Sequence, residues 1–272
     1  MEKLIDKMLN TDFEKFTTSD LNRPLLELDS RVLDEDKLVC IISGLLRKKN
    51  LSFIDSYKDE AITTIKALIK QLVIEVIASG DNEICLTGSG EEAQSLTLNE
   101  WIQLLDSATV SLLKLLKRIR LTHDVMLHVA DSSAGKFSEQ VNYLESDAFL
   151  SSVDHNHIEN KLTNLLQSVC NYCHERCANL VSNQSLEQYS GTMDEVEKLT
   201  HIVEEFCVGC EEVVGIKSVP LMTALKAQAT RFAQNFHAER KSKLNLILDN
   251  ERWKQAEVNF ALKYIKYIRS NN

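Results

Sequence analysis

The strongest constraint on the fold is an apolar stripe with helical spacing between Ser56 and Ser79. Its members recur at i, i+3, i+4 and i+7, which places them on one face of an α-helix. They are Ala61, Ile62, Ile65, Leu68, Ile69, Leu72, Val73, Val76 and Ile77. The 272 residues include only two prolines and eight glycines, whereas a β protein of this size needs many tight turns. We therefore expect an all-α fold.

Similar stripes predict further helices along the chain. Their approximate ranges are 32–46, 100–131, 156–180, 193–215 and 220–267. The first ends in Arg47-Lys48-Lys49-Asn50, where cations suit the negative end of a helix dipole. Ser95, Thr97 or Asn99 can cap the second. These lengths predict long antiparallel helices that form an elongated helical bundle or rod.

The chain divides into four predicted parts. Residues 1–79 hold N-terminal helices, and residues 80–96 form a flexible loop that contains three of the eight glycines. Residues 97–258 form a helical bundle, and residues 259–272 form a C-terminal tail. The segment from Phe137 to Val153 is the least regular part of the bundle.

Charge and hydropathy exclude several classes of function. With 31 Lys and Arg against 40 Asp and Glu, the net charge of −9 argues against general affinity for nucleic acid. No stretch reaches the roughly 20 apolar residues that cross a bilayer. The first residues, Met1 to Asp6, lack the apolar run of a secretory signal. We expect a cytosolic protein with reduced thiols.

The cysteines have the spacing of metal ligands. Cys170-x-x-Cys173-His174-x-x-Cys177 is followed by Cys207-x-x-Cys210, and two CxxC pairs can supply the four thiolates of a structural zinc site. Both pairs lie inside helical stripes, however, and free cysteine often packs as a small apolar residue. We interpret them as core residues and predict no metal. A zinc-stabilised helical binding module stays open, because the two cysteine-bearing helices could face each other.

No motif indicates an enzyme or a cofactor. The chain has neither a GxSxG nucleophile elbow nor a GxxxxGK[ST] phosphate loop. Asp154-His155-Asn156-His157 is typical of a loop or a helix start, because alternate side chains on a helix diverge.

A cluster of basic residues gives one further alternative. Lys114, Lys117, Arg118 and Arg120 are interpreted as the solvated side of a bundle helix. Direct binding of this face to anionic lipid is the alternative.

One segment resembles a known family. From Arg231 to Val258 the chain is similar to the FHxxRxxKLxxxLxNERWKQAxV stretch of the vacuolar protein sorting-associated protein 54 family. Looser similarity at Glu100–Leu105, Asp124–Met126, His174–Cys177 and Gly215–Ser218 extends the resemblance over about residues 60–258. The related syndetin family is the nearest alternative.

The resemblance implies a non-enzymatic subunit of the Golgi-associated retrograde protein (GARP) complex. Such tethering complexes capture endosome-derived carriers at the trans-Golgi network and promote SNARE-mediated fusion. The implied partners are the other GARP subunits and SNARE proteins, with membrane association only through the complex. The implied localisation is cytosolic and peripheral at the trans-Golgi network membrane, and no cofactor is implied.

Eight residues match the family motif: Phe236, His237, Arg240, Leu244, Asn250, Glu251, Arg252 and Trp253. Residues spaced by four lie on one helix face, so we expect Phe236, Leu244, Leu248 and the Trp253 ring to form a buried stripe. Arg240 would then extend to solvent, with Glu239 or Glu251 as its partner. The alternative is a contact patch for another subunit.

Both ends of the chain differ from what the resemblance implies. After Val258 the family is expected to continue with a Pro-Ala-Glu-Phe-like turn and a further helical lobe. An N-terminal coiled-coil region is also expected before the part represented here. A fragment, a truncated gene model and a divergent short form are the three explanations that we consider.

Overall fold

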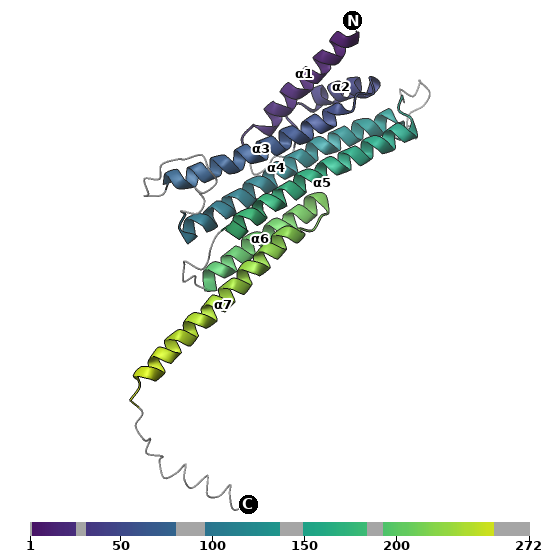
Figure 1. Cartoon of the computed structure of the whole chain (residues 1–272). Coiled ribbons are helices and arrows are strands. Elements are labelled where there is room, and N and C mark those ends of the chain that lie inside the picture. Colours follow the sequence, from purple (N-terminus) through teal and green to yellow (C-terminus); the bar gives the residue numbers. More distant parts are fainter. Residues whose placement is uncertain (1, 26–30, 80–95, 137–148, 184–192, 253–272) are drawn as a thin grey trace, which may run out of the picture. The chain divides into compact units, whose positions relative to one another are not determined.

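The computed structural model describes residues 2–25, 31–79, 96–136, 149–183 and 193–252, and all their regular elements are α-helices (Figure 1). These are α1 (Glu2–Leu21), α2 (Glu35–Arg47), α3 (Ser52–Ser79), α4 (Leu98–Ser133), α5 (Ser152–Asn183), α6 (Met193–Val214) and α7 (Val219–Asn250). The all-α prediction is confirmed. The chain forms two compact units, Met1–Phe232 and Ala233–Asn272, which divide α7 between them.

Helix α4 is the centre of the first unit, because it packs against α1, α2, α3, α5 and α6. It begins with a capping box: the Thr97 hydroxyl accepts from the Glu100 backbone N–H, and the Glu100 carboxylate accepts from the Thr97 N–H. Buried apolar side chains follow along most of its length: Trp101, Leu104, Leu105, Leu112, Leu115, Leu116, Ile119, Met126 and Val129. The predicted cap and stripe are both confirmed.

Helices α4 and α5 are antiparallel and are joined at both ends (Figure 1). At one end Trp101 Nε1 donates to the Leu180 carbonyl at 3.0 Å. At the other, His155 Nε2 lies 2.7 Å from Asp131 Oδ1. Burial opposes ionisation of Asp131, but hydrogen bonds from Lys136 and His155 still hold the pKa of this carboxyl below its usual range. His155 therefore lies in the first turn of α5 and makes a structural contact, which agrees with the helix-start prediction.

Helix α1 was not predicted as an element of its own. Phe13 packs edge-on against Phe53 and Tyr57 of α3, with ring centroids 5.1 and 6.3 Å apart. Phe16 is also buried. The spacing of Leu9, Phe13 and Phe16 is helical, so the signal was present but short, because the neighbouring positions are largely polar and exposed.

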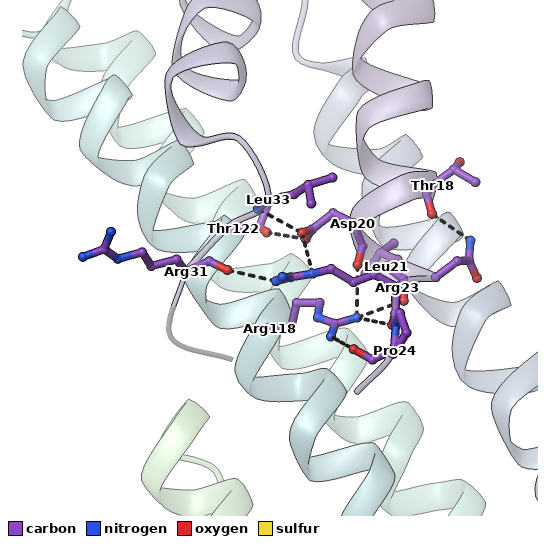
Figure 2. Close-up of polar contacts among 10 residues, drawn as sticks. Thr18, Asp20, Leu21, Arg23, Pro24, Arg31, Leu33, Arg118 and Thr122 are labelled. Carbon is purple, nitrogen blue, oxygen red and sulfur yellow. Dashed lines mark hydrogen bonds and ion pairs between the residues drawn. The ribbon is translucent and has the colours of Figure 1, made fainter. Parts of the chain in front are cut away.

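A buried arginine fixes the end of α1 against α4. Arg118 of α4 is fully buried, and Nη1 donates to the carbonyls of Asp20 and Arg23 at 3.1 and 2.9 Å. Nη2 donates to the Pro24 carbonyl at 2.8 Å, and Figure 2 shows the guanidinium pointing into the turn that follows α1. The last carbonyls of a helix have no partner within the helix, so a guanidinium satisfies several at once.

This arrangement corrects the prediction for the basic cluster. Arg118 belongs neither to a solvated face nor to a lipid-binding face, because its charge is used inside the fold. Arg120 pairs with Asp124 at 2.8 Å and also donates to the Val213 carbonyl of α6 at 3.4 Å. Lys117 is exposed.

Some predicted boundaries were wrong. Helix α3 begins at Ser52 instead of Ser56, and α7 ends at Asn250 instead of near residue 267. The Asn250 side chain donates to the Leu246 carbonyl at 2.8 Å and so caps the last turn. Most of the predicted 80–96 loop, much of the 137–153 segment and the 259–272 tail lie outside the described residues. None of the described helices combines the length and the low polarity needed to cross a membrane.

Candidate functional site

The residues of the family motif lie in the second unit. Phe236, His237, Arg240 and Leu244 belong to α7, and Asn250 is its last residue. Glu251 and Arg252 follow the helix, while Trp253 lies outside the described residues. We call residues 236–252 the motif segment. Every residue in it is exposed.

The buried stripe predicted for this segment is wrong for its described members. Phe236 is 40% exposed, Leu244 54% and Leu248 42%. Leu246 and Ile247 are exposed as well. Among the described residues of the second unit, α7 is the only element, and a single helix offers no second surface against which a stripe can be buried.

The polar residues of the segment pair locally. The guanidinium of Arg240 lies over the ring of Phe236, 4.6 Å from its centroid, one helical turn away. Glu239 hydrogen-bonds Lys243, and this bond holds the pKa of the Glu239 carboxyl below its usual range. Arg240 is exposed, as expected, and its charge also helps to lower the pKa of Glu239, one of its two predicted partners; the contact with the Phe236 ring was not predicted.

A second group of residues with chemical potential lies in the first unit. Cys170 and His174 of α5 and Cys210 of α6 are all buried, and one ligand atom from each lies within 4.8 Å of the others. Cys170 Sγ is 3.7 Å from His174 Nε2. The helices that carry the two CxxC pairs thus face each other. The group that converges joins one cysteine of each pair to a histidine and differs from the four-thiolate set considered from the sequence.

The other cysteines of α5 and α6 differ in how far they are buried. Cys173 and Cys177 are buried, as the core-packing interpretation predicted, and Cys207 is half-buried. Burial raises the pKa of the Cys177 thiol to about 12 and raises that of Cys173 as well. These two thiols stay protonated and behave as apolar core groups.

Cys170 has a different electrostatic environment. A hydrogen bond from Cys210 lowers the pKa of Cys170 to about 5. Burial acts in the opposite direction, whereas His174 lowers the pKa further. The same hydrogen bond and burial raise the pKa of Cys210. Of the thiols described here, Cys170 is the one whose surroundings favour a thiolate, the form that binds metal.

The site depends on close packing of the helices around it. Gly209, next to Cys210, lies so close to Leu113 of α4 that a Cβ at this position would come within 2.6 Å of the leucine side chain. At the start of α7, Gln228 Nε2 donates to the Val181 carbonyl of α5 at 2.7 Å. The i, i+4 spacing of Cys170 and His174 was visible in the sequence. Their alignment with Cys210 depends on how α5 and α6 pack, which local spacing does not give.

Comparison with known proteins identifies relatives of the chain. It is 52% identical over 264 residues to vacuolar protein sorting-associated protein 54 of Drosophila melanogaster, an alignment that covers 95% of this chain and 28% of that protein. It is 27% identical over 354 aligned positions to the protein of the same name from Homo sapiens, covering 95% of this chain and 36% of the human protein. The relative from Caenorhabditis elegans is 19% identical over 319 positions.

The alignments cover most of this chain but only part of each relative, so they do not establish the role of the whole relative for this chain. They cover more of the chain than the residues 60–258 over which the sequence resemblance was predicted. The chain spans about a third or less of the length of these relatives. The human alignment is longer than this chain, so the human protein carries additional residues between the aligned segments. No family model matches the chain. No solved structure matches it either.

Proposed function

Because the chain belongs by sequence to the vacuolar protein sorting-associated protein 54 family, we propose that it acts as part of a GARP-type vesicle-tethering subunit. The observation that carries this proposal is the 52% identity to the Drosophila protein over 95% of the chain. The chain corresponds to 28% of that relative, so the role of the whole subunit enters here as a proposal.

The proposed role is non-enzymatic. The chain contributes to retrograde transport from endosomes to the trans-Golgi network through contacts with the other GARP subunits and with SNARE proteins. It works from the cytosol and associates with the membrane peripherally, through the complex. Its long helices are suited to the rod architecture of such tethers.

We further propose that the motif segment is a contact surface for another subunit. Its exposed apolar side chains are Phe236, Leu244, Leu246, Ile247 and Leu248. Leu244, Ile247 and Leu248 are spaced by three and four and so share one face of α7, and contiguous exposed apolar surface is typical of protein interaction sites. Aromatic and arginine residues are enriched among the side chains that dominate binding energy, and the stacked pair of Phe236 and Arg240 provides one of each.

Affinity purification of the tagged chain from its own cells, followed by mass spectrometry, tests the proposal. We expect the other GARP subunits to copurify. Leu244→Asp combined with Leu248→Asp should abolish their recovery, because charges in the apolar stripe oppose its desolvation. The matched control is Ser242→Asp combined with Asn245→Asp, which adds the same two negative charges at exposed positions of the same helix.

Two results would count against the proposal. Recovery of no GARP subunit with the unmodified chain would show that these residues do not suffice for assembly. Equal recovery with the double variant would remove the motif segment from the interface.

Concentration of the tagged chain on recycling endosomes instead of the trans-Golgi network would favour the syndetin-type alternative.

A further inference from the structure

We propose that Cys170, His174 and Cys210 form a zinc-binding site that joins α5 to α6. The proposal concerns the first unit and is independent of the tethering role. It rests on the convergence of three side chains of zinc-binding type from two helices and on their burial.

The spacing of the ligand atoms fits a tetrahedral ion. Zinc binds sulfur at about 2.3 Å and imidazole nitrogen at about 2.0 Å, so a sulfur and a nitrogen on one tetrahedral ion lie about 3.5 Å apart. The observed separation of Cys170 Sγ and His174 Nε2 is 3.7 Å. Cys210 brings the third ligand atom from the facing helix, within 4.8 Å of both. Small side-chain rotations close this triangle onto one ion.

The helices hold the ligands without any movement of the backbone. Positions i and i+4 lie one above the other on a helix face, so Cys170 and His174 point the same way from α5. The ring of His174 packs edge-on against Phe206 of α6, with centroids 6.0 Å apart, and this contact limits its rotation. Two ligands are therefore fixed by one helix and the third by its neighbour.

The histidine lacks adequate hydrogen bonding in the metal-free structure. Nδ1 of His174 is buried and has no hydrogen-bond partner in the described part of the chain. Nε2 contacts only a thiol at 3.7 Å, which is a weak partner. Coordination of Nε2 to a cation would replace this weak contact with a strong one, while Nδ1 would keep its proton and gain no partner from the ion.

The donor set selects the type of metal. Two thiolates and an imidazole favour zinc over magnesium or calcium, which prefer oxygen ligands. A tetrahedral ion needs a fourth ligand. Cys207, one helical turn before Cys210 on α6 and half-buried, is one candidate thiol, and a water molecule is the alternative.

The first test measures metal in the full-length chain purified without chelator. We expect roughly one zinc ion per folded chain by mass spectrometry of metals, because structural sites of this kind bind tightly near neutral pH. Replacement of zinc by Co²⁺ should produce the thiolate-to-cobalt charge-transfer absorption. A helical chain that contains no zinc and gives no such absorption when titrated with Co²⁺ would overturn the proposal.

Variants assign the ligands. Cys170→Ser, Cys210→Ser and His174→Gln should each lower the bound zinc and abolish the cobalt charge-transfer band. Cys40→Ser is the matched control, since Cys40 is exposed and should leave both unchanged. Thermal unfolding guards against simple loss of folding: a chelator should lower the melting temperature of the unmodified chain, whereas variants that remain helical should not respond. Oxidation of Cys170 and Cys210 to a disulfide, with no bound metal, would also contradict the site.

Discussion

Two long helices of this molecule, α4 and α7, both carry apolar side chains but differ in how far these are buried. Helix α4 has 36 residues and is buried along most of its length by five neighbouring helices. Helix α7 has 32 residues and five leucines against the nine of α4, and from Phe236 onwards its apolar side chains are exposed. The difference lies in what surrounds each helix. An apolar stripe predicts that a surface will be covered, but whether by the same chain or by a partner depends on tertiary structure.

The largest expected effect comes from breaking the buried contact between α4 and α1. Arg118→Leu should lower the free energy of unfolding by about 3–5 kcal/mol, because it leaves several buried carbonyls without a donor. Urea denaturation monitored by circular dichroism measures this. Lys117→Ala, at the adjacent exposed position, should change stability by no more than about 0.5 kcal/mol.

A matched pair of leucine substitutions compares the two helices directly. Leu112→Ala in α4 should cost about 2–5 kcal/mol, because that side chain is completely buried and its loss leaves a cavity. Leu244→Ala in α7 should cost less than about 0.5 kcal/mol in the isolated chain. Equal costs at the two positions would contradict the difference in burial on which the comparison depends.

The cap of α4 provides a smaller effect. Thr97→Ala removes the hydroxyl that accepts from the Glu100 N–H and should lower the free energy of unfolding by about 1 kcal/mol. Thr97→Ser keeps the capping oxygen and should restore most of this stability. A serine variant as unstable as the alanine variant would indicate that the methyl group, and not the cap, carries the effect.

The smallest effect depends on pH. The pKa of Asp131 is lower in the folded chain than in the unfolded chain. The ionised carboxylate therefore stabilises the fold at pH values above the unfolded pKa. This stabilisation is lost as the pH falls through the pKa of the folded chain. Asp131→Asn should therefore lower the melting temperature slightly at neutral pH. The difference between the two proteins should shrink below about pH 4. A difference that grows in acid would reverse the sign of this linkage.

Local signals gave much of the fold. The cap at Thr97, the stripe of α4 and the basic end of α2 were all predicted, because each depends on residues within one or two turns. Helix α1 was missed although seven of its 20 residues are apolar, because Leu4, Ile5 and Met8 are exposed and the burial of Phe13 depends on contacts with α3. Arg118 could not be identified as buried, because the carbonyls that it binds lie more than 90 residues earlier in the chain.

The candidate sites were predictable to different degrees. The motif segment was found through its similarity to a family, but its exposure contradicts the packing expected from helical spacing. For the cysteines, burial was predicted correctly from their place in helical stripes, except at Cys207, which is half-buried. Which of the cysteines lie next to His174 was not predicted, because this depends on the relative register of α5 and α6. In both cases the missing information was a contact between distant segments.

Amide hydrogen exchange of the chain, alone and in the complex recovered by affinity purification, tests the central claim most directly. The account predicts that amides of residues 236–250 exchange rapidly in the free chain and slowly in the complex, while those of the buried part of α4 exchange slowly in both. Protection of residues 236–250 in the free chain would contradict their exposure. Rapid exchange there in both states would contradict their proposed role as a subunit contact.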